Sequence, residues 1–241
     1  MFESGVAEAF QADIARRSKP VSLKAALDAA PAPAIIAEVK RASPSKGEFA
    51  RQWDPVELAQ TFQDNGAAAI SVLTEVHYFK GDPEFIRRMR PVIRLPILRK
   101  DFILEPIQVY ETAALGADAL LLIVTLLELG KLRALLLLTR SLGLEAMVEV
   151  HTEPEMAAAV AARAGVIEIN SRNLHTFEMF PERPLELAPL APPGVTLVAA
   201  SGIKSRADIE KYQAAGIRAF LIGERLVLEP DPGKKLREFL S

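Results

Sequence analysis

Charged side chains recur near the ends of apolar stretches in this 241-residue chain. The stretch IIAEVK carries Glu38 and Lys40, and PILRK ends on Lys100. EAMVEVH carries Glu149, and VIEINSR places Glu168 between two isoleucines. A carboxyl group set among such apolar residues is expected to be buried, and burial raises its pKa and makes it a stronger base. Carboxylates and ammonium groups in this pattern indicate general acid–base chemistry.

Strand geometry would bring these residues together. Side chains alternate in direction along a strand, so Glu38 and Lys40 share one face, and Glu168 shares a face with Asn170 and Arg172. Any one such residue is as often a structural ion pair beneath a loop as a functional group. Several carboxylates and cations at one place exceed what stability requires, because each charge removed from water must be compensated. We therefore expect a functional site where these strands end.

The elements that must position these residues follow from the hydrophobic pattern. Eight short apolar runs predict strands at 34–40, 68–74, 95–100, 118–124, 145–151, 166–172, 196–201 and 219–223. Helical patterns lie between them, and several end in a glycine C-cap. This alternation predicts a single (β/α)8 TIM barrel of class α/β, whose chemistry lies at the C-terminal ends of the strands. An open doubly wound sheet is the alternative, and it is disfavoured because no glycine-rich dinucleotide motif follows the first strand.

Composition limits the classes of partner. We expect an N-terminal helical extension, residues 1–33, and a barrel, residues 34–241. The net charge of -2 favours neither nucleic acid nor a membrane surface, so the partner should be a small molecule. The chain has no cysteine and no signal-peptide core, which fits a cytoplasmic protein. His77, His151 and His175 share no ligand-like spacing, so we predict no metal.

Two glycine-bearing turns follow the last two predicted strands. They are ASGIKS, with Ser201 and Gly202, and IGERL, with Gly223. Backbone N–H groups and helix N-termini at this position are a common phosphate site in such barrels. The motif is short, and ordinary turn formation and helix capping explain it equally well.

Longer motifs give the chain a resemblance to the indole-3-glycerol phosphate synthase family over essentially the whole barrel. The motifs are IIAEVKRASPSKG, ISVLTEVHYFKG, PILRKDFILEPIQVYE, LGLEAMVEVHTEPEM, INSRNLHTFE and AFLIGE. The resemblance implies a (β/α)8 enzyme that decarboxylates and closes the ring of an anthranilate-derived ribulose phosphate without a cofactor. It implies Lys100 as general acid, Glu149 as general base and Lys40 as a second acid contacting the substrate carboxylate. It also implies a pocket shaped by Glu38, Phe79, Asn170 and Ser201, and a phosphate site of Arg172, Gly202, Gly223 and Glu224.

The chain departs from the family pattern at several site positions. Where the family reads SESGI this chain reads AASGI, so Ala200 replaces a functional carboxylate. Where the family reads IGIN this chain reads IEIN, so Glu168 occupies a glycine position that faces the barrel interior. Arg225 appears beside the phosphate turn, and TFEMFP introduces Met179 and Phe180. The exchange of carboxylates indicates coordinated change, because an interior glycine-to-glutamate change is costly unless the pocket is rebuilt around it.

These departures lead to the hypothesis of an engineered, recombinant synthase scaffold similar to designed Kemp eliminases on this barrel. Glu168 would be the general base that takes a ring proton from a benzisoxazole, a small aromatic substrate, while the N–O bond breaks and a cyanophenolate leaves. Lys100, Lys40 or Ser201 would donate to the developing phenolate. The apolar walls around the base would be Phe79, Phe102, Leu121, Leu174, Phe180 and Leu221.

Three alternatives stay open. An ion pair between Glu168 and Lys100 would lower the pKa of the proposed base and occupy its lone pairs. The chain would be a working synthase if the retained Lys40, Lys100 and Glu149 still act on the natural substrate. A non-catalytic barrel that binds an anion or an aromatic ligand is the third alternative. We expect a monomer that retains a site for phosphate or sulfate.

Overall fold

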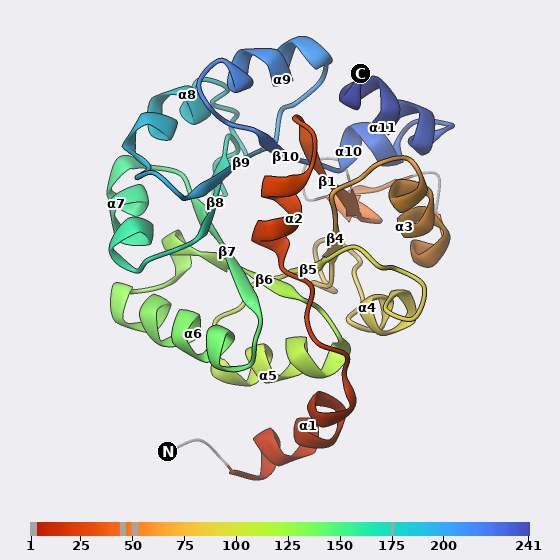
Figure 1. Ribbon diagram of the computed structural model, residues 1–241, viewed down its shortest axis with the longest axis vertical. Helices are drawn as coiled ribbons and strands as arrows, with labels where there is room; N and C mark the ends of the chain where they lie inside the picture. Colours follow the sequence, from red (N-terminus) through yellow and green to blue (C-terminus); the bar gives the residue numbers. More distant parts are fainter. Residues whose placement is uncertain (1–3, 44–46, 50–52, 175) are drawn as a thin grey trace.

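Eight parallel strands close into a barrel in a computed structural model of the chain, as predicted (Figure 1). The structure describes residues 4–43, 47–49, 53–174 and 176–241. Around the barrel the order is β1, β4, β5, β6, β7, β8, β9 and β10, with β10 paired to β1. The strands are β1 (Ala34–Val39), β4 (Ala69–Leu73), β5 (Ile97–Lys100), β6 (Ala119–Ile123), β7 (Glu145–Val150), β8 (Val166–Asn170), β9 (Thr196–Ala200) and β10 (Ala219–Ile222).

Helices surround the barrel as an outer ring (Figure 1). They are α3 (Pro55–Asp64), α4 (Glu84–Met89), α5 (Pro106–Leu115), α6 (Leu129–Ser141), α7 (Glu153–Ala161), α8 (Arg183–Leu187), α9 (Arg206–Gln213), α10 (Glu224–Val227) and α11 (Pro232–Leu240), with the 3-10 turns η1 (Val124–Leu126) and η2 (Ala188–Leu190). Local sequence sets their ends. The Asp54 side chain accepts hydrogen bonds from the first turn of α3, and Gly116 ends α5 with a φ of 90°.

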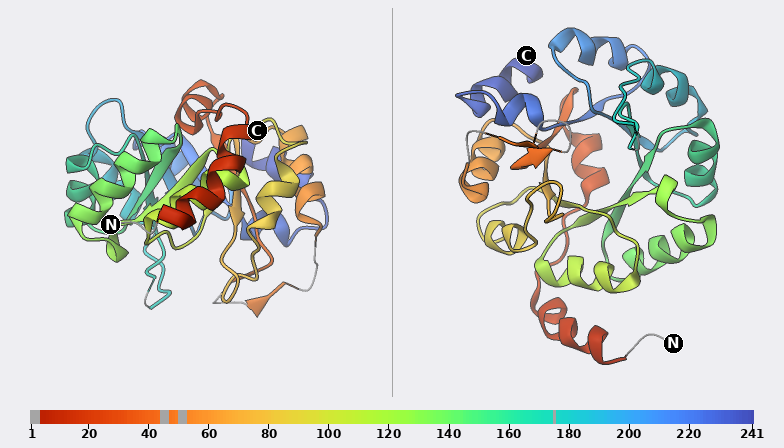
Figure 2. Two further views of the ribbon diagram at one scale, coloured as in Figure 1. Left: turned by 90° about the horizontal axis from the view of Figure 1, so that it is seen from below. Right: turned by 180° about the vertical axis from the view of Figure 1, so that it is seen from behind.

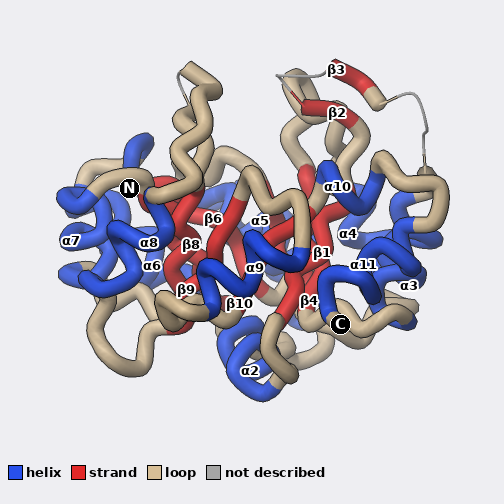
Figure 3. The backbone as a smooth tube through the Cα atoms, turned by 90° about the horizontal axis from the view of Figure 1, so that it is seen from above, coloured by secondary structure: helices blue, strands red, loops and turns tan. Residues whose placement is uncertain are grey.

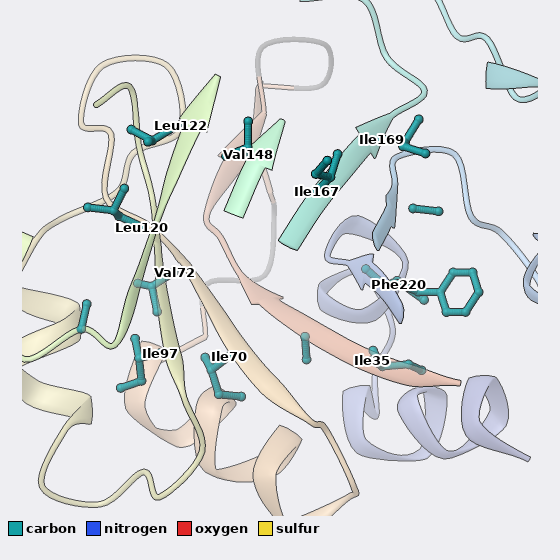
Figure 4. Close-up of a cluster of buried hydrophobic side chains, with 14 of the residues drawn as sticks. Ile35, Ile70, Val72, Ile97, Leu120, Leu122, Val148, Ile167, Ile169 and Phe220 are labelled. Carbon is teal, nitrogen blue, oxygen red and sulfur yellow. The ribbon is translucent and has the colours of Figure 1, made fainter. Parts of the chain in front are cut away.

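Strand alternation divides the core into two parts. Ile167 and Ile169 of β8 belong to the large cluster between the strands and the helices, together with Phe220 of β10 (Figure 4). Val166 belongs instead to the smaller cluster inside the barrel. Glu168 follows the same alternation as Val166, so its side chain faces the interior. The prediction that Glu168 is buried among apolar residues is therefore confirmed, and the alternation of side chains along β8 explains why it faces the barrel interior.

The two ends of the barrel differ. Helix α2 (Leu23–Ala29) covers one end, where Leu23 and Leu27 join the interior cluster. The small hairpin of β2 (Ala42–Ser43) and β3 (Gly47–Glu48) extends from the opposite end, as does the loop after β8 (Figures 2 and 3). The C-terminal ends of the strands point to this second end. A cavity there would therefore be bordered by long loops.

Helix α1 (Ser4–Arg16) lies outside the barrel and packs against α5. Residues 1–3 of the predicted extension lie outside the described residues. The division of the chain at residue 33 stays a prediction. No helix among the described residues is long and apolar enough to cross a membrane.

Candidate active site

A cavity of about 420 Å³ opens at the C-terminal ends of the strands. The structure brings nearly all the predicted site residues to its lining. These are Glu38, Lys40, Phe79, Lys100, Phe102, Leu121, Glu149, Glu168, Asn170, Arg172, Leu174, Ala200, Ser201, Gly202, Leu221 and Gly223. They come from most of the barrel strands and from the loops that follow them. The arrangement agrees with the rule that chemistry in these barrels lies at this end.

Phe180 is the exception, and its prediction as a wall of the cavity is wrong. The Arg183 guanidinium lies 4.4 Å from the centre of the Phe180 ring, outside the cavity lining. Its neighbours Met179 and Pro181 line the cavity instead. Residues 172 and 179 form an antiparallel bridge, and side chains along extended backbone alternate in direction. Phe180 therefore points away where Met179 points in.

Lys100 lies at the centre of the buried charges. Its Nζ is 3.0 Å from Glu168 Oε1 and 3.2 Å from Glu168 Oε2, and 3.3 Å from Glu149 Oε2. Burial works against the charged ammonium, but Glu168, Glu149 and Glu38 outweigh it and raise the pKa of Lys100 above its ordinary value. Lys100 is therefore protonated at neutral pH and able to act as an acid.

Glu149 is held ionised by its neighbours. Asn170 Nδ2 donates to Glu149 Oε1 at 3.0 Å, and His151 Nε2 lies 3.2 Å from the same oxygen. Burial opposes ionisation, but the Lys100 charge and the contacts with His151 and Asn170 lower the pKa of Glu149 below its usual range. Its Oε2 atom faces Lys100. Glu149 thus carries the charge that a general base requires.

His151 forms a charged layer behind Glu149. Its Nδ1 lies 3.4 Å from Glu155 Oε2, and the Glu155 carboxylate also accepts the backbone N–H of His151. Burial disfavours the imidazolium, but Glu149 and Glu155 outweigh it and raise the pKa of His151 to about 9. The ring therefore carries a positive charge at neutral pH. Sequence reasoning had assigned His151 to loop packing and had missed this role.

Glu168 has 0 % of its surface exposed and lies beside Glu149 in the register of β7 and β8. Burial raises its pKa above the ordinary glutamate value, and the nearby Glu149 adds to the effect, whereas Lys100 opposes it. Both oxygens of Glu168 contact the Lys100 ammonium. The contacts are those of the ion-pair alternative, but the lowered pKa that this alternative predicted is wrong, because burial outweighs the Lys100 charge and the pKa of Glu168 is raised.

Glu38 and Lys40 form a second pair at the same end of the barrel. Lys40 Nζ lies 2.9 Å from Glu38 Oε1. A β-carbon at Gly223 would lie 2.3 Å from Glu38 Oε1 and 2.9 Å from Glu38 Cβ. The close approach of β1 and the turn after β10 thus requires glycine at position 223.

The turn after β9 reverses sharply. Ser201 and Gly202 both have positive φ, 64° and 74°. Arg172, Lys204 and Arg225 line the cavity near these turns, so this part of the wall carries several cations. Such a wall suits a phosphate group. Arg225, which departs from the family pattern, adds to the positive charge at this end.

Several lining residues were not predicted. Leu73 and Ile123 share the inward face of their strands, so the alternation already noted could have identified them. Glu75 lines the cavity, and its carboxylate accepts hydrogen bonds from the backbone N–H groups of His77, Tyr78 and Phe79. No sequence motif predicted this turn. No group of three or more metal-ligating side chains occurs among the described residues. His175 lies outside them.

The family model that matches this chain and the similar relatives given below belong to one family. The model of the indole-3-glycerol phosphate synthase family matches residues 3–239. A synthase of this name from Carboxydothermus hydrogenoformans is 50% identical over 226 residues, covering 92% of this chain and 86% of the relative. One from Mycolicibacterium gilvum is 44% identical over 251 residues, covering 98% of this chain and 92% of the relative.

Solved structures resemble the fold at low sequence identity. The KGPDC of Streptococcus mutans has a TM-score of 0.66 at 13% identity, covering 87% of this chain and 96% of that one. The 3-hexulose-6-phosphate synthase from Salmonella typhimurium has a TM-score of 0.68 at 10% identity, covering 86% of this chain and 96% of that one. These likenesses confirm the barrel fold alone.

The prediction of a designed Kemp eliminase is wrong. The matching family and the similar relatives are synthases over nearly the whole chain, which favours the alternative of a working synthase. The departures at Glu168 and Ala200 had suggested a rebuilt pocket with a free base. In the fold, the Lys100 ammonium contacts both oxygens of Glu168, so the carboxyl group is paired and not free.

Proposed function

The chain belongs to the indole-3-glycerol phosphate synthase family, and we propose that it catalyses the decarboxylating ring closure that gives indole-3-glycerol phosphate. The substrate is an anthranilate-derived ribulose phosphate. One carbon–carbon bond forms, the anthranilate carboxylate leaves as carbon dioxide, and the ketone oxygen leaves as water. The reaction requires an acid at that oxygen and a base for a carbon-bound proton, and it requires no external oxidant or reductant.

The contact between Lys100 and Glu149 is the observation that carries the proposal. The two groups come from strands on different parts of the barrel and lie 3.3 Å apart beneath one cavity. Each has the protonation state that its role requires at neutral pH, because the pKa of Lys100 is raised and that of Glu149 is lowered. Lys100 would give the ketone oxygen its first proton as the carbon–carbon bond forms, and Glu149 would accept the proton lost from carbon. Lys40, the second acid that the resemblance implies, would supply the second proton with which that oxygen leaves as water.

The rest of the cavity supports binding of the same substrate. The apolar side chains that line it, among them Phe102, Leu121 and Leu174, suit an aromatic ring. Lys40 would contact the anthranilate carboxylate, and Arg172 with the Ser201–Gly202 turn would contact the phosphate. The three chemical parts of the substrate thus have three matching parts of the wall.

The test is an assay of the purified chain with the natural substrate, with the indole fluorescence of the product as readout. Lys100→Met should lower kcat at least about 100-fold, because a positioned general acid contributes that much or more. The matched control is Lys211→Met, which removes a lysine paired with Glu182 on the surface and should leave kcat unchanged. A folded parent chain that forms no indole product would overturn the proposal, as would a Lys100→Met variant as active as the control.

A further inference from the structure

Glu168 is a fully buried carboxyl group to which the reaction as proposed gives no part. It lies in the middle of β8, inside the barrel, directly beside Glu149 of β7. Within the part of the chain that the structure describes, Lys100 is the only side chain that donates a hydrogen bond to Glu168. Burial raises the pKa of this carboxyl group and the Lys100 ammonium opposes the rise, so the charged form of Glu168 depends on the contact with Lys100. A buried ion pair of this kind is weak evidence for a stabilising role, because an apolar replacement of similar size is often as stable. The contact with Lys100 therefore calls for a functional explanation.

The distances around Lys100 indicate what Glu168 does. The ammonium is 3.0 Å and 3.2 Å from the two Glu168 oxygens and 3.3 Å from Glu149 Oε2. It is thus held more closely by Glu168 than by Glu149. The family pattern has glycine at position 168 and a carboxylate at position 200, whereas this chain has Glu168 and Ala200. In this chain, loss of Glu168 would leave Glu149 as the carboxylate bonded to Lys100, and the attraction between the two buried charges would draw Lys100 onto it. The acid and the base of the reaction would then neutralise one another in a tight ion pair.

Because Glu168 holds the Lys100 ammonium, one oxygen of Glu149 remains available to accept a proton. Its Oε1 atom accepts a hydrogen bond from Asn170 Nδ2 at 3.0 Å and lies 3.2 Å from the His151 Nε2 atom of the charged ring. Its Oε2 atom has the long contact to Lys100. A base must offer a lone pair to the proton that it accepts, so Oε2 is the oxygen that a substrate would reach.

We propose that Glu168 is a positioning residue that holds the Lys100 ammonium away from Glu149, so that the acid and the base of the synthase reaction stay separate and available. The inference rests on the proposed function. It gives Glu168 no contact with the substrate and no proton transfer of its own. Its effect is on the geometry of Lys100, so it should appear in kcat and not in substrate binding.

Glu168→Gln is the principal test, because the amide keeps the shape of the side chain and removes its charge. We expect kcat for the natural substrate to fall roughly 10- to 100-fold with KM changed less than about threefold, since misplacement of a catalytic group by about 1 Å has effects of this size. A crystal structure of the variant should show Lys100 Nζ closer to Glu149 Oε2 than the present 3.3 Å. If Glu168 had only a structural role, the variant would lose stability, but the folded protein would keep the parent's kcat and the parent's distance between Lys100 Nζ and Glu149 Oε2.

Two further variants complete the experiment. Glu168→Asp keeps the charge but withdraws it by one methylene group from Lys100, so its kcat should lie between those of the parent and the glutamine variant. The matched control is Ser71→Ala, which alters another fully buried polar position, on β4, that does not line the cavity and should leave kcat unchanged.

The outcomes separate this inference from the proposed function. A folded parent without synthase activity overturns the function itself. An active parent whose glutamine and aspartate variants retain its kcat overturns the positioning role only, and so does a rise in KM at constant kcat. Should the glutamine variant fail to fold, the kcat of the aspartate variant decides the question.

Discussion

Replacing His151 with glutamine should remove a pH dependence from the thermal stability of this protein. His151 contacts Glu149 through Nε2 and Glu155 through Nδ1, and these two carboxylates raise its pKa from 6.5 to about 9. A histidine whose pKa is raised on folding stabilises the folded state fully below its unfolded pKa. That stabilisation is lost as pH rises through the folded value. The window of interest therefore lies between pH 6.5 and 9.

The size of the effect follows from the same values. Between pH 7 and pH 10 the contribution of His151 to the free energy of unfolding should fall by about 2.5 kcal/mol, from 1.36 kcal/mol per pKa unit. For a chain of this length that corresponds to a decrease in Tm of roughly 5–10 °C. Glutamine places a neutral donor near the position of Nε2, so the contact with Glu149 can persist while the titrating charge is removed.

The assay is thermal unfolding of the parent and of His151→Gln across this pH range, because other groups titrate in both proteins and cancel in the difference. The parent should lose more Tm than the variant between pH 7 and pH 10. Imidazole ¹⁵N resonances should also show the His151 ring doubly protonated at pH 8. Equal pH slopes in the two proteins, or a neutral ring at pH 8, would refute the account of the charged layer behind Glu149.

Two other substitutions test the fold and the site separately. Asp118→Asn should destabilise the protein by about 3–5 kcal/mol in urea unfolding, because it leaves Arg90 and Arg17 without their buried counter-charge. Asp118 is 2% exposed, and its Oδ2 lies 2.6 Å from Arg90 Nη1. Asp118 does not line the cavity, so the kcat of the folded fraction should stay at the parent value. A variant as stable as the parent would contradict the predicted loss of stability. Gly223→Ala should lower kcat/KM about 100-fold, because the added carbon displaces Glu38 from Lys40. Gly130→Ala on α6, where an added carbon meets nothing within 4 Å, is its control, and equal activity of the two variants would show that Gly223 has room to spare.

Much of the fold and of the site could be predicted from local pattern. The eight short apolar runs and the helical patterns between them predicted eight strands, and these agree with the strands of the barrel to within a few residues. The rule that chemistry lies at the C-terminal ends of the strands then selected Lys100, Glu149 and Glu168, which do line one cavity. These predictions succeeded because alternation and strand ends are properties of neighbouring residues.

The predictions that failed concern directions and partners across the barrel. Phe180 was expected in the wall of the cavity, and the bridge between residues 172 and 179 turns it outward against Arg183. His151 was taken for a packing residue, and Glu155 of the following helix makes it a charged one. The residue type of Phe180 or His151 does not indicate the bridge or the helix contact that sets its role, so local pattern could not predict either.

The sequence by itself determined the barrel, the end at which chemistry occurs and the charged residues gathered there, because periodicity and strand ends are local properties. Only the tertiary structure decided which charges pair. Lys100 is 49 residues from Glu149 and 68 from Glu168 along the chain, and barrel closure sets the distances of 3.3 Å and 3.0 Å between them. A difference of a few tenths of an ångström between such contacts decides whether a buried carboxylate is a free base or the holder of an ammonium group. That difference depends on how all eight strands close.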